Sequence, residues 1–330
     1  MLLIINDSSN AYYNLAAEEY LIDHFDEDVV MLWRNDNTVV VGKNQNTIEE
    51  IDSRYVEEKG INVVRRLTGG GAVFHDMGNV NYTIIQAHRE GLFSNYDYFT
   101  KMVRDFLQTL GVEAVLSGRN DLLIDGKKFS GNAQCVRHGR MMHHGTLMFS
   151  SDVKDISGAL TPNQKKIESK GVKSVSSHVT NISTHMEHSE SIDTEQFMLR
   201  LYEYYLENYP EAVPYRLSQD DKKAIQKLAD EKYSTWAWNY GASPAFAVSA
   251  SRKYDFGLVD VRLNVKRGRI RDIRIYGDYF GIRNISEIEE RLKDAEYRQD
   301  NIAEVLQSFD LEEYISGMTA EELTELIVKR

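Results

Sequence analysis

The stretch that decides the fold reads Arg65-Arg66-Leu67-Thr68-Gly69-Gly70-Gly71-Ala72-Val73-Phe74-His75-Asp76. It lies between a β-rich run at 62–64 and another at 80–85. Three consecutive glycines permit positive φ angles and let a ligand approach the backbone closely. Their N–H groups can surround phosphate oxygens, and the guanidinium of Arg66 can pair with a carboxylate or phosphate through two hydrogen bonds. The stretch fits neither a Walker A loop nor a Gly-x-Gly-x-x-Gly dinucleotide motif, and a flexible turn is the alternative interpretation.

A second glycine-containing segment carries a candidate catalytic lysine. Asp125-Gly126 separates two short β-rich runs and predicts a tight hairpin. Lys128 follows this turn and precedes Ser130-Gly131-Asn132-Ala133. A lysine in this position can hold a point charge beside an anionic reacting group, although most lysines are simply solvated. Asn120 and Asp121, just before the turn, offer oxygen ligands of the kind that Mg²⁺ accepts.

Helical and extended signals interleave irregularly along the chain, which predicts an α+β fold rather than a regular βαβ winding. We predict helices over 10–24, 47–59, 98–110, 193–208 and 218–233, and strands over 29–33, 38–41, 62–64, 80–85, 121–124, 128–129 and 142–149. Small and turn-forming residues cluster at 239–244, and beyond them 259–266 and 270–276 predict a hairpin with one solvated face. Helices are predicted over 285–292, 300–309 and 319–328. The sequence therefore predicts a main domain at about 1–240 and a smaller α+β domain at about 250–330.

Composition narrows the possible partners. The 330 residues include 51 acidic and 39 basic side chains, for a formal net charge of −12, which argues against a protein that binds nucleic acid. No apolar run approaches the ~20 residues of a membrane helix. One cysteine, Cys135, excludes an internal disulfide and fits a reducing compartment. We expect a cytoplasmic monomer with no nucleic-acid or membrane partner.

Six stretches together resemble the lipoate–protein ligase family, and the resemblance extends over essentially the whole length. They are residues 41–46, 65–76 with Gly78-Asn79, 118–121, 128–133, 144–147 and 236–241. The resemblance implies a large catalytic α+β domain of the biotin and lipoate ligase type, followed by a small C-terminal domain. The predicted boundary near residue 240 agrees with that arrangement.

The resemblance also implies a two-step acyl transfer that uses ATP and Mg²⁺. Lipoate or octanoate would first form an acyl adenylate and release pyrophosphate. A lysine ε-amine would then take the acyl group and release AMP, on a lipoyl domain of a 2-oxoacid dehydrogenase complex or on the glycine cleavage H protein. The chain needs no nucleophile of its own for this reaction, but it needs positive charge where the carboxylate meets the α-phosphate.

The resemblance assigns roles to individual residues. The family's essential lysine matches Lys128, which would contact both the acyl carbonyl and the α-phosphate. Asp121 is the candidate metal ligand, and Trp33 and Val73 would line the acyl channel, with core packing as the alternative for Trp33. The ATP and adenylate contacts would come from Arg66, Gly69, Gly70, Gly71, Ala72, Val73, Phe74, His75, Asn120, Asp121, Lys128, Ser130, Gly131 and Ala133. His75 could instead be a buried histidine bonded to its surroundings.

Other histidines and one basic segment have simpler interpretations. Adjacent residues of a strand face opposite ways, so His143 and His144 cannot easily share a metal, and we interpret them as scaffold. Residues 154–173, rich in lysine, are expected to be solvated and could contact an acidic acceptor domain. Ser176 and His178 stand where the family commonly has arginines, which predicts altered affinity or acceptor choice.

Two other functions are left open. One is an ATP-independent octanoyl- or lipoyl-transferase that forms a thioester, for which Cys135 is the only cysteine. The other is a lipoate-binding protein without catalysis. In the ligase interpretation, Cys135 is a small packed side chain.

Overall fold

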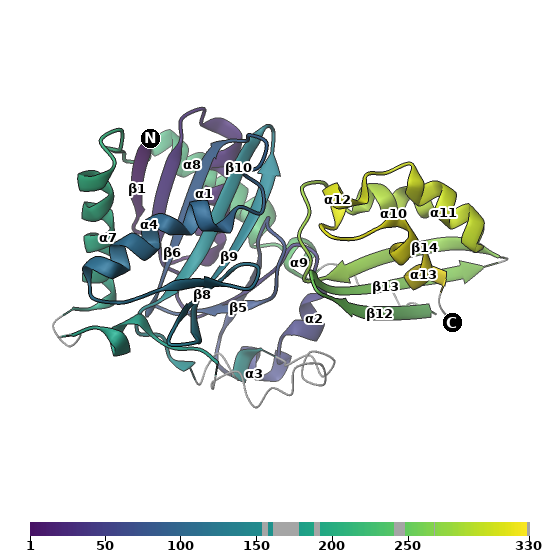
Figure 1. The fold of residues 1–330 in the computed structure, drawn as a ribbon, viewed down its shortest axis with the longest axis horizontal. Coiled ribbons are helices and arrows are strands. Elements are labelled where there is room, and N and C mark those ends of the chain that lie inside the picture. The colour runs from purple at the N-terminus through teal and green to yellow at the C-terminus, as the bar shows by residue number, and fades with distance from the viewer. Residues whose placement is uncertain (154–157, 161–177, 188–191, 241–247, 267, 329–330) are drawn as a thin grey trace.

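The computed structural model describes residues 1–153, 158–160, 178–187, 192–240, 248–266 and 268–328. A large mixed sheet forms one body and a small sheet with its own helices forms a second body beside it (Figure 1). In order across the large sheet the strands are β11 (Val213–Pro214), β1 (Leu2–Asn6), β2 (Val29–Trp33), β6 (Asn79–Ala87), β10 (Arg140–Met148), β9 (Lys127–Arg137), β8 (Asp121–Ile124) and β7 (Val115–Ser117). The first three run parallel and the remaining pairs are antiparallel.

Both faces of the large sheet are covered, because its central strands are apolar on both sides. In β2 all five side chains are buried. Val30 and Leu32 pack on one face with α4 (Tyr96–Thr109) and α7 (Thr194–Asn208). Val29, Met31 and Trp33 pack on the other face with α1 (Ala11–His24) and α8 (Gln219–Leu228), and the π-helical segment Ala229–Tyr233 follows α8. Because successive side chains of a strand point to opposite faces of the sheet, β2 contributes side chains to both cores.

A second, three-stranded sheet lies on the α1 side and positions the glycine-rich loop. Its order is β4 (Asn62–Arg65), β3 (Thr38–Val41) and β5 (Val73–His75). β3 is parallel to β4 and antiparallel to β5, so residues 66–72 cross from one edge strand to the other. Val40 and Val64 of this sheet pack into the same core as α1.

The C-terminal part has its own core. β12 (Val248–Tyr254), β13 (Gly257–Lys266) and β14 (Arg269–Gly277) form an antiparallel sheet. It shares one core with the helices that follow: α10 (Ser286–Leu292), α11 (Gln299–Gln307), α12 (Leu311–Tyr314) and α13 (Ala320–Val328). The predicted hairpin is confirmed: Val259, Val261 and Leu263 are buried, and the residues between them are more exposed.

Most predicted elements are present, and three expectations need correction. The helix predicted over 47–59 is instead two short helices, α2 (Thr47–Glu50) and α3 (Ser53–Glu58). They are separate because Ile51 pairs with Leu160 as an isolated bridge. The second helix begins after Asp52, whose side chain accepts a hydrogen bond from the Tyr55 amide. The hairpin strand predicted at 128–129 continues to Arg137, and the single helix predicted over 218–233 changes to a π-helical segment at Ala229. The strands β1, β5, β7, β11 and β12 and the short helices α9 (Trp236–Asn239) and α12 were not predicted. None of the described helices is both long and apolar enough to cross a membrane.

Candidate active site

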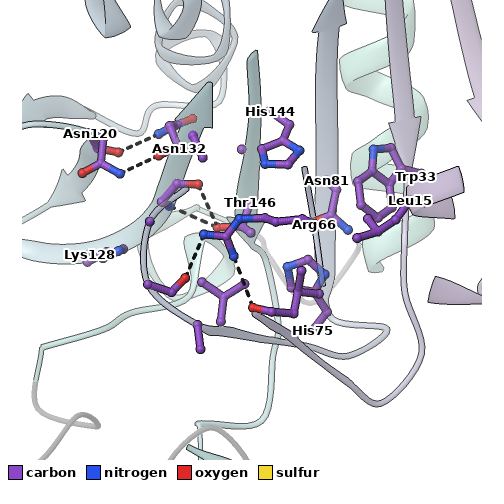
Figure 2. A pocket seen from close by; sticks show the side chains of 18 residues that line it. Leu15, Trp33, Arg66, His75, Asn81, Asn120, Lys128, Asn132, His144 and Thr146 are labelled. Atoms are coloured by element: carbon purple, nitrogen blue, oxygen red, sulfur yellow. Dashed lines mark hydrogen bonds between the residues drawn. The ribbon is translucent and has the colours of Figure 1, made fainter. Parts of the chain in front are cut away.

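An open cavity of about 610 Å³ lies where the α1 side of the large sheet meets the glycine-rich loop (Figure 2). Its lining includes the predicted residues Trp33, Arg66, Gly70, Gly71, Ala72, Val73, His75, Asn120, Lys128, Gly131 and Ala133. Residues far apart in sequence are thereby brought together at one cavity.

Four predicted residues are not part of this lining. Phe74 is buried in the core formed by β3 and β4, and Ser130 is buried where its Oγ accepts from Asn132. Gly69 lies against the backbone oxygen of Tyr279. Asp121 is bound to Lys128.

Seven lining residues were not predicted: Leu15, Val40, Asn81, Asn132, His144, Gly145 and Thr146. For His144 the scaffold interpretation is therefore incomplete, because this side chain both packs and lines the cavity. Polar residues in the middle of a buried strand, such as Asn81 in β6, were a signal that sequence reasoning could have used.

Arg66 holds the glycine-rich loop in shape. Its guanidinium donates to Thr68 Oγ1 at 2.9 Å and to the carbonyls of Val40, Gly69 and Gly71 at 3.2, 2.7 and 2.9 Å. Burial is the main cause that lowers the pKa of Arg66 to about 10, so the group stays charged at neutral pH. In this arrangement most of its donors serve the loop, and its contact with a ligand stays a prediction.

The loop leaves its own amides free to receive an anion. Gly70 has φ of +91°, and a Cβ there would lie 2.9 Å from the Arg66 Nη2. Within the described residues, the backbone N–H groups of 69–72 make no hydrogen bond. Unpaired amides in a glycine turn form the kind of concavity that binds phosphate oxygens.

Lys128 lies at the cavity wall, and the end of its side chain is next to Gly131. A Cβ at Gly131 would lie 3.0 Å from Lys128 Nζ, so the glycine makes room for this side chain. Nζ donates to Asp121 Oδ1 at 2.7 Å, and both side chains are more than one-third exposed. An irregularity in the β8–β9 pairing lies beside this lysine, since Leu122 pairs with Ser130 but Leu123 pairs with Lys128. Such bulges commonly redirect side chains at functional sites.

Residues 178–180 contact Lys128 directly through the backbone, and they include one of the two predicted departures from the family, His178. The Lys128 N–H donates to the His178 carbonyl at 2.8 Å, and the Thr180 N–H donates to the Lys128 carbonyl at 2.9 Å. The His178 side chain is exposed. Ser176 and all but 158–160 of the lysine-rich stretch 154–173 lie outside the described residues.

Asn120 is fixed by Asn132. The Asn132 backbone N–H donates to the Asn120 carbonyl at 3.0 Å, and the Asn120 side chain donates to the Asn132 carbonyl. Asn132 Oδ1 in turn accepts from the buried Tyr82 hydroxyl. One bond from the Asn120 side chain and bonds to its carbonyl thereby hold this residue at the cavity (Figure 2).

A buried chain of hydrogen bonds connects α1 to the glycine-rich loop. Glu18 Oε1 accepts from Thr83 at 2.6 Å and from His144 Nδ1 at 2.8 Å. The other ring nitrogen, His144 Nε2, lies 2.8 Å from the Thr68 Oγ1. Thr68 is the residue that accepts from Arg66, so the chain of bonds fixes Arg66 as well.

Part of the C-terminal domain packs on the glycine-rich loop. A Cβ at Gly69 would lie 2.3 Å from the Tyr279 carbonyl oxygen, and one at Gly70 would lie 3.1 Å from the Phe280 ring. The Arg119 guanidinium lies 4.2 Å from the centre of the same ring. The Gly277 N–H donates to the Asn44 carbonyl at 2.7 Å. The loop is thus in contact with both domains.

Cys135 is a packed side chain on the α1 side of the large sheet. Burial is the main cause that raises the pKa of its thiol to about 12, which disfavours the thiolate that a nucleophile needs. It is not among the residues that line the cavity.

Comparison with known proteins matches both parts of the chain to family models of lipoate ligases. The family model described as "Lipoyl protein ligase A/B catalytic domain" matches residues 10–206, and "Bacterial lipoate protein ligase C-terminus" matches 243–327. Lipoate-protein ligase LplJ of Bacillus subtilis is 44% identical, over 99% of this chain and 100% of its own length.

Solved structures agree in fold. LipL1 of P. falciparum, solved with lipoate, covers 100% of this chain and 99% of its own with a TM-score of 0.83 at 24% identity. A lipoate-protein ligase A solved with bound ATP covers 73% of this chain and 98% of its own, with a TM-score of 0.63 and 25% identity. These matches extend over the catalytic and the C-terminal parts, and the chain therefore belongs to the lipoate–protein ligase family of enzymes.

Proposed function

We propose that this chain is an ATP-dependent ligase that attaches lipoate, or octanoate, to protein lysines in two steps. A carboxylate oxygen of the acid attacks the α-phosphorus of ATP, the bond from that phosphorus to the bridging oxygen breaks, and pyrophosphate leaves. The acceptor's ε-amine then attacks the acyl carbonyl carbon, the bond to the AMP oxygen breaks, and the amine loses a proton. Support comes from family membership and from the related ligase A with bound ATP.

The proposal depends on one observation: Lys128 shares a cavity with the glycine-rich loop. In the first step two anions must approach each other, and the charge of Lys128 would reduce their repulsion. The unpaired amides of 69–72 would hold phosphate oxygens without adding further charge. Arg66 and the chain from Glu18 would keep the loop in this shape before the substrates arrive.

Magnesium would enter with the nucleotide. The described residues contain no group of three or more His, Cys, Asp or Glu side chains that could hold a metal. A single carboxylate such as Asp121 fits Mg²⁺ only when phosphates and water supply the other ligands. Asp121 would become available when Lys128 turns from it toward a phosphate.

The acceptor and the division of the chain are also part of the proposal. We assign catalysis to about 1–240, and assign an accessory role to about 250–330. Apo lipoyl domains and the glycine cleavage H protein are the proposed acceptors, modified by a monomer in the cytoplasm. Because the net charge of −12 opposes an acidic acceptor, residues 154–173 are the proposed docking segment.

Replacing the lysine tests the proposal. Lys128→Ala should reduce pyrophosphate release from ATP and lipoate by about 100-fold or more, because the charge between the two anions is lost. Lys127→Ala is the matched control, since its exposed side chain is next in sequence and does not line the cavity. Retention of activity in Lys128→Ala, or acyl transfer by the wild type without ATP, would contradict the proposal.

The thioester alternative makes the opposite prediction for Cys135. In the ligase, Cys135→Ser should keep acyl transfer within about threefold of the wild type, because a buried side chain outside the cavity is only exchanged for a similar one. The measurement is transfer of lipoate to an apo lipoyl domain, followed by mass spectrometry. A dead Cys135→Ser enzyme of normal stability would favour the transferase, and lipoate binding without pyrophosphate would favour a binding protein.

A further inference from the structure

The end of the cavity away from Lys128 is formed by an aromatic ring and two buried polar side chains. In Figure 2, Trp33 and His75 lie on the opposite side of Arg66 from Lys128 and Asn120. Trp33 pairs with Asn81 across β2 and β6, and its ring centre lies 6.3 Å from that of His75. The indole N–H of Trp33 is already bound to Thr83 at 2.8 Å. Trp33 therefore offers this end of the cavity only its apolar surface.

A series of hydrogen bonds among three buried asparagines, of which Asn35 contacts the ring, fixes the tautomer of His75. Asn14 Nδ2 lies 2.9 Å from the carbonyls of Ser8 and Arg34, which identifies it as the amide nitrogen. The Asn35 atom 2.9 Å from it must then be the oxygen, so Asn35 turns its nitrogen toward His75 Nδ1 at 3.1 Å. Nδ1 accepts this hydrogen bond, and the ring proton is therefore on Nε2. Asn6, which donates to Asn14 Oδ1, completes the series.

His75 and Asn81 each carry a buried donor without a partner. His75 is 3% exposed and Asn81 is 2% exposed. Within the described residues, His75 Nε2 and Asn81 Nδ2 make no hydrogen bond. Burial lowers the pKa of His75 to about 3, with Arg66 and His144 adding to the effect, so the ring stays neutral. Two uncharged donors at one end of a cavity are costly unless a ligand supplies acceptors.

We propose that His75 and Asn81 select, at the distal end of the acyl chain, for a ring with acceptor atoms such as the sulfurs of lipoate. The inference rests on the proposed function, since it takes Lys128 to mark the carboxyl end. Divalent sulfur is a weak acceptor and packs well against aromatic rings, which suits two neutral donors beside Trp33. An aliphatic end leaves both donors unpaired and therefore binds less tightly.

Calorimetry with three acids tests the selection. The ligands are lipoate, octanoate and the carbocyclic analogue of lipoate in which both sulfurs are methylene groups, each added without ATP. The wild type should bind lipoate about tenfold more tightly than the carbocyclic analogue, because the two rings differ only in acceptor atoms. His75→Phe and Asn81→Leu should each reduce this ratio to about threefold, because each removes one of the two donors, and the double variant should bring it close to one.

Controls separate this proposal from a loss of folding. Tyr205→Phe removes another buried and unpartnered polar atom, in the core on the other face of the sheet, and should not change the ratio. Asn35→Asp should move the His75 proton to Nδ1, visible in the ¹⁵N shifts of the imidazole, and should also reduce the ratio.

Two results would overturn the inference: a wild type that binds both ring acids equally, or variants that keep the preference for lipoate. The proposed function fails separately, if the wild type shows this preference but releases no pyrophosphate.

Discussion

Two histidines of the cavity use Nδ1 in opposite ways, and each is oriented by a different buried partner. His144 donates from Nδ1 to Glu18, whereas His75 accepts at Nδ1 from Asn35. Neither partner is close in sequence. A histidine is a donor or an acceptor at a given point only when such a partner fixes the tautomer. Sequence could therefore name His75 as a candidate without saying which atom it would present.

Burial of His75 predicts an acid-sensitive fold. Its folded pKa of about 3 is below the unfolded value of 6.5, so between these values the unfolded chain binds more protons. Stability should therefore rise with pH up to about 6.5 and then level off. At pH 5 the histidine should cost about 2 kcal/mol relative to pH 7.

Urea unfolding at pH 5 and pH 7 measures this cost. His143, whose pKa burial also lowers, acts in the same direction, so the useful quantity is the difference between wild type and His75→Phe. The variant should lose about 2 kcal/mol less than the wild type between the two pH values. An identical loss in both proteins would refute the assignment of the low pKa to His75.

At the scale of elements, Arg65 joins three segments that the sequence separates. From the end of β4 its guanidinium donates to the carbonyls of Gly42, Lys43 and Gln45, and to those of Trp238 and Asn239. It also donates to Thr47 at the start of α2. Arg65, from the stretch 65–76, thus holds two other stretches that carry the family resemblance, 41–46 and 236–241.

Arg65→Met should loosen both segments. The methionine fills a similar volume but leaves several buried carbonyls without donors, at a cost of about 3 kcal/mol in the free energy of unfolding. Denaturant unfolding measures the loss, and hydrogen exchange should become faster in 42–47. Arg89→Met, at an exposed site, is the control and should change the free energy by no more than about 0.5 kcal/mol.

Sequence reasoning succeeded for elements whose signal is local. The strand at 29–33, the helix at 10–24 and the Asp125-Gly126 turn were predicted because periodicity and turn residues act within a few positions. It failed at 47–59, where Ile51 pairs with a residue more than a hundred positions away. It also did not predict β12, whose residues are only half-buried and lack a clear alternation.

At the scale of the whole molecule, the contact between the domains lies at the glycine-rich loop rather than at a distant surface. Arg119 packs on the Phe280 ring and donates to the carbonyls of Phe256 and Asp278. Phe280 in turn lies over Gly70. A side chain at either glycine 69 or 70 would therefore disturb the site and the domain contact together.

Arg119→Ala should weaken this domain contact without unfolding either core. Amide exchange at 277–281 should become at least several-fold faster, because the Gly277 bond to Asn44 is lost more often when the contact opens. Hydrogen exchange with mass spectrometry gives the result. The control is Arg298→Ala, which removes the exposed ion pair with Asp300 in the C-terminal domain and should leave exchange at 277–281 unchanged. Unchanged exchange in Arg119→Ala would mean that Arg119 does not support the contact.

By itself, the sequence determined the α+β class, most helices and strands, and the set of stretches that identify the family, because these depend on local patterns and on short motifs. Only the tertiary structure decided that β2 and β3, neighbours in sequence, enter different sheets. It also decided that Arg66 serves the loop, that Asp121 pairs with Lys128, and that Asn81 lies beside Trp33. These facts depend on strand register and on packing between residues tens of positions apart, and no local pattern in a single chain specifies either.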